Sequence, residues 1–194
     1  MTSQKPLLSS YGGTHMTAQE FLEKLKEKTG GKIIREDIDP MNYSSSRSGP
    51  LPRFCPRLYA DYKKHYIKVD FIDAGEILFE VNMGTPHMLL IRPENVVSKL
   101  LDKINLSPEV KIGDASFDTQ YIIQNVSEEN AKKTINEKFK LVVKSLEPFV
   151  EFEMTGKEYR LLKMVDIASD YTPEKAVFDL DALMELVDVI KAAK

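Results

Sequence analysis

The segment "GDASFD" brings two carboxylates, Asp114 and Asp118, close together with a serine between them. Oxygen ligands at alternate positions are what an EF-hand calcium loop uses, so the spacing raises the question of a metal site. Such a loop also needs Gly at its sixth position and Glu at its twelfth, where this chain has Thr119 and Asn125. The pattern is incomplete, and we expect no metal ion at this segment.

A turn that leads into a strand explains the same residues. Asp side chains in turns accept hydrogen bonds from backbone N–H groups, which we predict for Asp114. We expect Phe117 to be buried as an anchor and Asp118 to start the strand that follows. Asp114 and Asp118 still count as candidate binding residues, because a site assembled from distant positions could combine them with a histidine such as His87.

A second group of candidates combines cations with aromatic rings. Its members are Tyr43, Arg47, Arg53, Phe54, Arg57, Tyr59, Tyr62, Lys63 and Lys64. Aromatic rings interleaved with cations can hold single-stranded nucleic acid or an acidic peptide. A solvated loop without a specific role has the same composition and is the alternative. Tyr43, Arg47, Arg53 and Arg57 are the candidate binding residues of this group.

Familiar catalytic and phosphate-binding motifs are absent from the sequence. There is no G-x-x-x-x-G-K-[ST], no G-x-G-x-x-G and no G-x-S-x-G. The histidines His15, His65 and His87 have no second ligand at helical spacing, and Cys55 has no identifiable catalytic histidine. We therefore predict no cofactor and no metal, and we leave open whether the chain is an enzyme.

The composition is that of an ordinary globular protein. Of 194 residues, 42% are hydrophobic and 29% charged, and the net charge is −3. Negative net charge argues against nucleic-acid binding by the whole molecule. The sequence contains no apolar run of membrane-spanning length and no signal-peptide core, and its single cysteine excludes an internal disulfide. We expect a soluble, cytoplasmic protein with no membrane contact.

One domain is predicted to follow a disordered tail. Residues 1–15 are polar and show no periodicity, so the domain is expected to span 16–194. Within it, "DIDPMNYSSSRSGPLPRFCPR" contains four prolines and a serine cluster. We predict a long mobile loop there, over about 37–57.

Hydrophobic periodicity predicts an α+β fold for the rest of the domain. Thr17 and Glu20 have the spacing of a capping box at the start of a helix. Alternating apolar and polar residues over 58–92 indicate antiparallel strands. Further elements are expected as a helix from 94, a strand over "FDTQYIIQN", a helix from Ser127 to about Pro148, and a hairpin over 149–165. Strands grouped in runs favour antiparallel sheet packed by about four helices.

The last helix is predicted from about Asp179 to Ala193, with Asp179 or Asp181 as its cap. Its apolar residues cover more than one face. Such a helix is either buried on two sides or packed against another chain. We therefore expect an interaction with a protein partner or a dimer, formed through this helix or through an exposed sheet edge.

The second half of the chain resembles a family of uncharacterised prokaryotic proteins, best over residues 92–190. The resemblance is carried by "RPE" before a helix, "GDASFDTQYIIQ", the hairpin "VEFEMTGKEYRLLK" and the closing "DLDALMELVDVI". The corresponding family patterns are RPE, GDxxFDxxFxV, LELxxxxGxLxLxL and LxxLLDLxxAL. This chain departs from the family at Val126-Ser127-Glu128, where the family often has an acidic pair. The resemblance implies a domain type of unknown function and no particular activity.

Two functions of different classes follow from the sequence. The first is a non-enzymatic interaction or scaffold domain, which the lack of a complete catalytic motif favours. The alternative is a small-ligand-binding protein or a hydrolase whose site is assembled from distant polar residues. This alternative requires a pocket with convergent polar groups.

Overall fold

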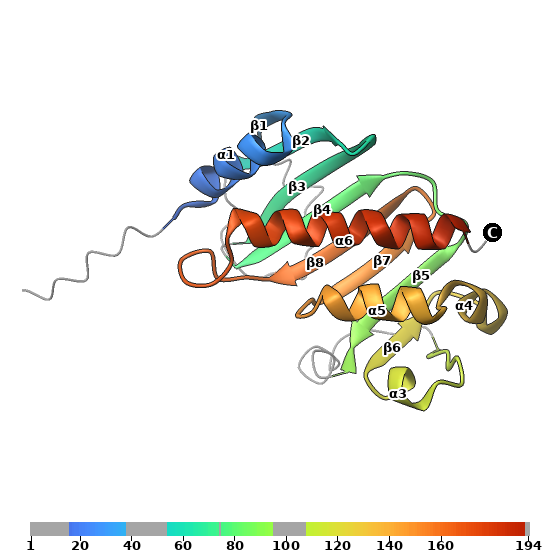
Figure 1. Cartoon of the computed structure of the whole chain (residues 1–194). Coiled ribbons are helices and arrows are strands. Elements are labelled where there is room, and N and C mark those ends of the chain that lie inside the picture. Colours follow the sequence, from blue (N-terminus) through green and yellow to red (C-terminus); the bar gives the residue numbers. More distant parts are fainter. Residues whose placement is uncertain (1–15, 38–53, 74, 95–107, 193–194) are drawn as a thin grey trace, which may run out of the picture.

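Eight strands form one antiparallel sheet, in the order β1-β2-β3-β4-β8-β7-β5-β6 (Figure 1). The structure is a computed structural model that describes residues 16–37, 54–73, 75–94 and 108–192. Its strands are β1 (Lys32–Asp37), β2 (Phe54–Tyr62), β3 (His65–Asp73), β4 (Glu76–Asn82), β5 (Met88–Pro93), β6 (Tyr121–Gln124), β7 (Glu151–Thr155) and β8 (Glu158–Met164). Its helices are α1 (Ala18–Thr29), α3 (Ala115–Asp118), α4 (Glu128–Thr134), α5 (Glu137–Ser145) and α6 (Pro173–Ala192). The predicted α+β class is confirmed.

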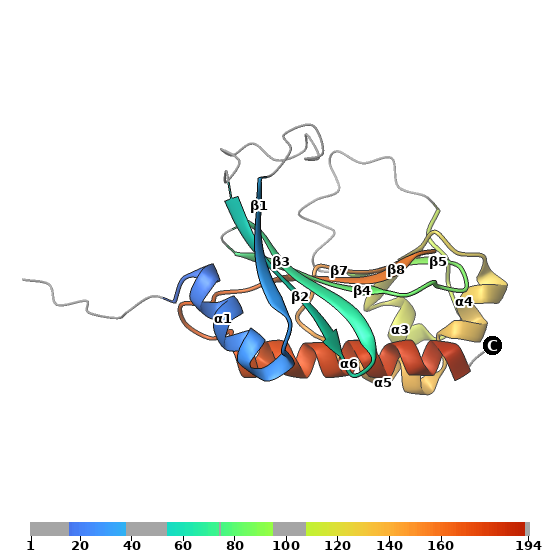
Figure 2. The same cartoon turned by 90° about the horizontal axis from the view of Figure 1, so that it is seen from above.

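One face of the sheet carries a layer of helices. Figure 2 shows α6 lying along this face, with α1 and α5 on the same side. Alternate residues of the strands point toward these helices, as in β3, where Ile67, Val69 and Phe71 are buried. The core therefore lies between the sheet and the helices.

Helix α1 begins and ends as the sequence predicts. The side chains of Thr17 and Glu20 each accept a hydrogen bond from the other's backbone N–H. Gly30 follows the helix with a positive φ of 75°. Phe21 and Leu22 face the core with no exposed surface.

The strands on either side narrow the loop predicted over about 37–57, mainly at its C-terminal end. Strand β1 includes Asp37, and β2 already begins at Phe54, with Pro56 opposite Arg35 in the ladder. Proline lacks one ladder donor, and the pairing of β2 with β3 begins only at Arg57, so β2 is paired on one side alone at Pro56. Residues 38–53, 1–15 and 95–107 lie outside the described residues, as do the predictions made for them.

Two boundaries in the second half also differ from expectation. The segment predicted as one helix from Ser127 to Pro148 is two helices, because the side chain of Asn136 accepts a hydrogen bond from Phe139 N and starts α5 anew. The strand predicted from Phe117 begins only at Tyr121. The preceding residues form the short helix α3 instead.

Helix α6 starts at Pro173, six residues before the predicted start at Asp179. Asp179 is therefore an interior residue, and neither it nor Asp181 is a cap. Proline suits the first turn of a helix because its missing N–H would have no partner there. The buried residues of α6 face the sheet, α1 and α5, so its broad apolar surface is covered within the chain. That pattern is explained without a second copy, and self-association stays a prediction.

Candidate functional site

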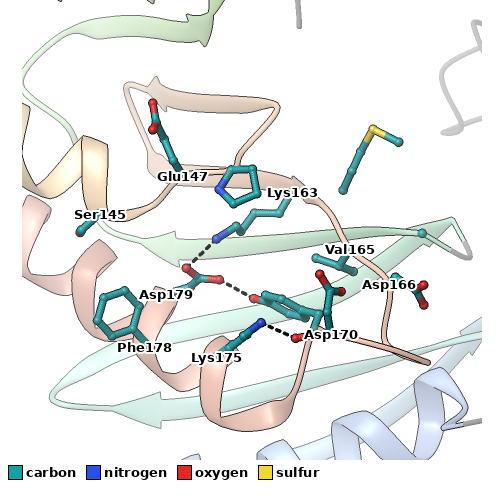
Figure 3. Close-up of a pocket in the computed structure, with 13 residues that line it drawn as sticks. Ser145, Glu147, Lys163, Val165, Asp166, Asp170, Lys175, Phe178 and Asp179 are labelled. Atoms are coloured by element: carbon teal, nitrogen blue, oxygen red, sulfur yellow. Dashed lines mark hydrogen bonds and ion pairs between the residues drawn. The ribbon is translucent and has the colours of Figure 1, made fainter. Parts of the chain in front are cut away.

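A pocket of about 510 Å³ lies where β8, the segment between α5 and β7, and the first turns of α6 meet (Figure 3). It is lined by Gly75, Ser145, Glu147, Pro148, Lys163, Met164, Val165, Asp166, Asp170, Tyr171, Lys175, Phe178 and Asp179. Its volume is within the range of small-molecule sites. The segments that line it come from three separate parts of the chain.

Three polar side chains form a buried hydrogen-bonded group in this pocket. Lys163 Nζ lies 2.6 Å from Asp179 Oδ1, and the Tyr171 hydroxyl donates to Asp179 Oδ2 over 2.5 Å. The exposed fractions of Lys163, Tyr171 and Asp179 are 5%, 7% and 3%. A buried ion pair is tolerated only when its charges and remaining polar atoms have partners, and Asp179 has a donor on each oxygen.

The strand and helix periodicities explain how this group arises. Lys163 continues the helix-facing row of β8 after Tyr159 and Leu161, which are both buried. Asp179 lies on the buried side of α6, beside Leu180 and Ala176. A lysine in a core-facing strand position and an aspartate on an apolar helix face are the sequence signals that were missed.

The environment of Tyr171 fixes its hydroxyl as a donor. Burial, followed by the negative charge of Asp179 and the hydrogen bond to it, raises the pKa of Tyr171 far above its ordinary value. The Lys163 ammonium group also lies 5.8 Å from the centre of the Tyr171 ring. The Tyr171 hydroxyl therefore keeps its proton near neutral pH and donates it to Asp179.

The mouth of the pocket is apolar on two sides. Met164 and Phe178 are 68% and 57% exposed, which is high for such large hydrophobic side chains. Pro148 and Val165 continue this apolar surface. Apolar side chains that line a pocket offer contact surface to a ligand.

Acidic side chains make up most of the remaining rim. Asp166 accepts hydrogen bonds from Ala168 N and from the Ser169 hydroxyl, so it shapes the loop before α6. Glu147 accepts a hydrogen bond from the Tyr121 hydroxyl. Lys175 donates to the backbone carbonyl of Asp170 over 2.5 Å.

The predicted site residue Asp114 is a helix cap. Its carboxylate accepts hydrogen bonds from Ser116 N and Phe117 N, and Lys140 Nζ lies 2.6 Å away. The Lys140 ammonium group and then these backbone bonds hold the pKa of Asp114 below its ordinary value. The turn and the burial of Phe117, which is 5% exposed, are confirmed.

Asp118 also serves the turn, but it ends α3 and does not start a strand. It accepts hydrogen bonds from Ile112 N and Gly113 N at 3.0 and 2.9 Å. A second pocket, of about 270 Å³, lies beside Asp114 and is lined in part by Lys140 and Lys144.

The structure does not bring the two predicted groups of site residues together. Arg57 lies in β2, where its Nε is 2.8 Å from Asp70 Oδ2, and five strands separate β2 from β6, the strand after Asp118. Tyr43, Arg47 and Arg53 lie outside the described residues. His87 contacts the Thr134 hydroxyl, with 3.0 Å between that oxygen and its Nε2.

Neither a metal-binding cluster nor a membrane helix is found in the described part of the chain. No three His, Cys, Asp or Glu residues there are grouped so that they could hold a metal ion. None of the helices described combines the length and apolar composition needed to cross a bilayer.

Comparison with known proteins gives a similarity of fold. No protein-family model matches the chain, and no curated protein matches it in sequence. Among solved structures, the mycobacterial trehalose monomycolate transport factor A, TtfA, is similar with a TM-score of 0.58 and 9% sequence identity. The match covers 88% of this chain and 92% of that one. At this identity the likeness concerns the fold alone, and the resemblance to a prokaryotic family stays a prediction.

Proposed function

We propose that the protein is a non-catalytic binding domain and that the pocket beside α6 holds a small amphipathic ligand. The observation that carries the proposal is a pocket of about 510 Å³ with two kinds of lining. Its floor, formed by Lys163, Tyr171 and Asp179, is buried and polar, and its rim includes the exposed apolar side chains of Met164 and Phe178. Such a site can enclose the polar part of a molecule while its rim covers an apolar part.

The arrangement of the floor favours binding over catalysis. A general base or nucleophile needs a free lone pair near the substrate. Here Asp179 accepts hydrogen bonds from both Lys163 and Tyr171, and the raised pKa of Tyr171 keeps its proton in place. These groups are suited to hold a ligand in position, and a hydrolytic function has less support.

The fold neighbour supports the same general role. TtfA is described as a transport factor. A chain of similar fold that binds a molecule without transforming it would fit a related accessory role, and the pocket offers a place for that molecule. The scaffold function predicted from the sequence shares this non-catalytic character, but the volume and polar lining of the pocket favour a small ligand over a protein partner.

Titration with the uncharged dye Nile red tests the proposal. We expect its fluorescence to rise on binding, and the Kd to weaken about five- to tenfold in Phe178→Ala and Met164→Ala, because each removes apolar contact surface. Leu141→Ala is the matched control, since Leu141 is 69% exposed and does not line this pocket. Absence of dye binding, or equal Kd values in all three variants, would contradict the proposal.

A further inference from the structure

The ammonium group of Lys163 has more donors than its protein partners use. A lysine carries three N–H donors. Within the described residues, Asp179 is the one hydrogen-bond partner of Lys163 Nζ, although the side chain lines the pocket and is only 6% exposed. Buried donors are nearly always satisfied. The floor of the pocket is therefore prepared to donate a hydrogen bond to an acceptor that enters it.

The charges around the pocket limit which acceptor can enter. Lys163 and Asp179 neutralise each other at the floor. Among the described residues that line the pocket, three carboxylates, those of Glu147, Asp166 and Asp170, accompany one further ammonium group, that of Lys175. An anionic ligand would meet a surplus of negative charge, so a neutral acceptor is favoured.

The positions of the apolar groups complete the description of the ligand. Met164 and Phe178 line the pocket and are exposed. Lys163 is buried and points toward Asp179 (Figure 3). A ligand with an apolar carbon chain on the rim side and a carbonyl oxygen inside would satisfy both the apolar rim and the Lys163 ammonium group. Hydroxyl groups on the ligand could donate to the Asp170 carboxylate, because Asp170 is exposed and lines the same pocket.

We propose that the pocket selects an uncharged acyl ester, whose carbonyl oxygen accepts a hydrogen bond from Lys163 Nζ while its acyl chain packs against Phe178. This inference rests on the proposed function and adds the chemical class of the ligand. Lys163 is then the residue that determines specificity, and Asp179 positions it.

Three probes with the same number of chain carbons test this class. They are decanoyl glycerol, an ester; decyl glycerol ether, which lacks the carbonyl; and decanoate, which is anionic. We expect the ester to displace Nile red with a Kd about tenfold lower than that of the ether, because a hydrogen bond from a charged donor is lost. Decanoate should bind more weakly than the ester. Equal binding of ester and ether, or tighter binding of decanoate, would overturn the inference.

The variant Lys163→Met/Asp179→Leu gives a second measurement. It removes both charges together, and we expect it to bind the ester and the ether equally. If this variant does not fold, the ester and ether comparison on the unaltered protein still decides the question. Nile red binding without ester preference would reject the ligand class alone, whereas no Nile red binding at the rim would reject the proposed function.

Discussion

At the scale of single residues, Gly31 lies in the turn between α1 and β1, in close contact with β2. Its φ is +92°, and a Cβ built on it would lie 2.1 Å from the carbonyl oxygen of Tyr59 and 2.6 Å from Ala60 Cβ. Glycine alone accepts such a backbone without strain and leaves room for the strand. The turn after α1 therefore depends on this residue for two separate reasons.

We predict that Gly31→Ala destabilises the protein more than Gly30→Ala. Gly30 also has a positive φ, of 75°, but a Cβ there would meet no atom within 4 Å. Gly30→Ala should cost about 1–3 kcal/mol of backbone strain. Gly31→Ala should cost a further 1–3 kcal/mol or so, because β2 must shift. Urea unfolding measures both, and equal free energies of unfolding would contradict the close approach.

Residue roles were predictable from the sequence where they depend on near neighbours. Thr17, Asp114 and Ser127 cap helices, and each contacts residues two or three positions away. Asp179 was misassigned as a cap because an aspartate near a helix start commonly caps it. Its partner Lys163 lies on another element, and only the packing of α6 on β8 brings the two together.

At the scale of elements, the β2–β3 hairpin is closed by two residues in the left-handed region. Lys63 and Lys64 have φ values of 49° and 68°. Two-residue hairpin turns favour this backbone because its twist matches that of the strands, but Asn and Gly adopt it more readily than lysine. Lys63 also pairs with Asp181 of α6 at 2.7 Å, which ties the hairpin to the helix layer.

We predict that Lys64→Gly stabilises the protein by about 1 kcal/mol, because glycine relieves the left-handed strain. Lys64→Ala is the control, since it removes the same charge and keeps the strain. Thermal unfolding should therefore give a higher Tm for the glycine variant than for the alanine variant. A lower Tm for the glycine variant would show that the entropy of the unfolded chain outweighs the relief of strain.

Element boundaries could be predicted only where a local signal was unambiguous. The period-two alternation predicted antiparallel strands over 58–92, and β3 and β4 both lie in that range. The apolar stripe from Ala131 to Leu146 looked like one helix, because its spacing continues across Asn136. The cap that Asn136 forms divides this stripe into two helices. Spacing alone cannot show whether the continuing apolar stripe or the cap decides where a helix ends.

At the scale of the whole molecule, the order of strands was beyond the sequence. Strand β4 pairs with β8, and β5 lies between β6 and β7, so partners come from distant parts of the chain. These choices depend on how the helices cover one face, which no local pattern specifies. The pocket has the same origin, since it forms where β8, α6 and the segment before β7 meet.

The Lys163–Asp179 pair joins the sheet to the helix layer, and we predict a large effect of breaking it. Asp179→Asn leaves the Lys163 charge buried without a counter-charge and should cost about 3–5 kcal/mol. Asp181→Asn is the matched control on the same helix. Its side chain is 41% exposed, pairs with Lys63 and accepts a hydrogen bond from the Tyr62 hydroxyl. The amide oxygen of asparagine can accept the same hydrogen bond, so this change should cost less than about 1 kcal/mol.

Removing both charges should largely restore stability, because no unpaired charge then remains in the core. Urea unfolding of Asp179→Asn, Asp181→Asn and Lys163→Met/Asp179→Leu measures the three free energies of unfolding. If Asp179→Asn costs no more than Asp181→Asn, the pair does not hold the layers together. A double variant as unstable as Asp179→Asn would instead show that Tyr171 needs the carboxylate, since its hydroxyl would then be left without its acceptor.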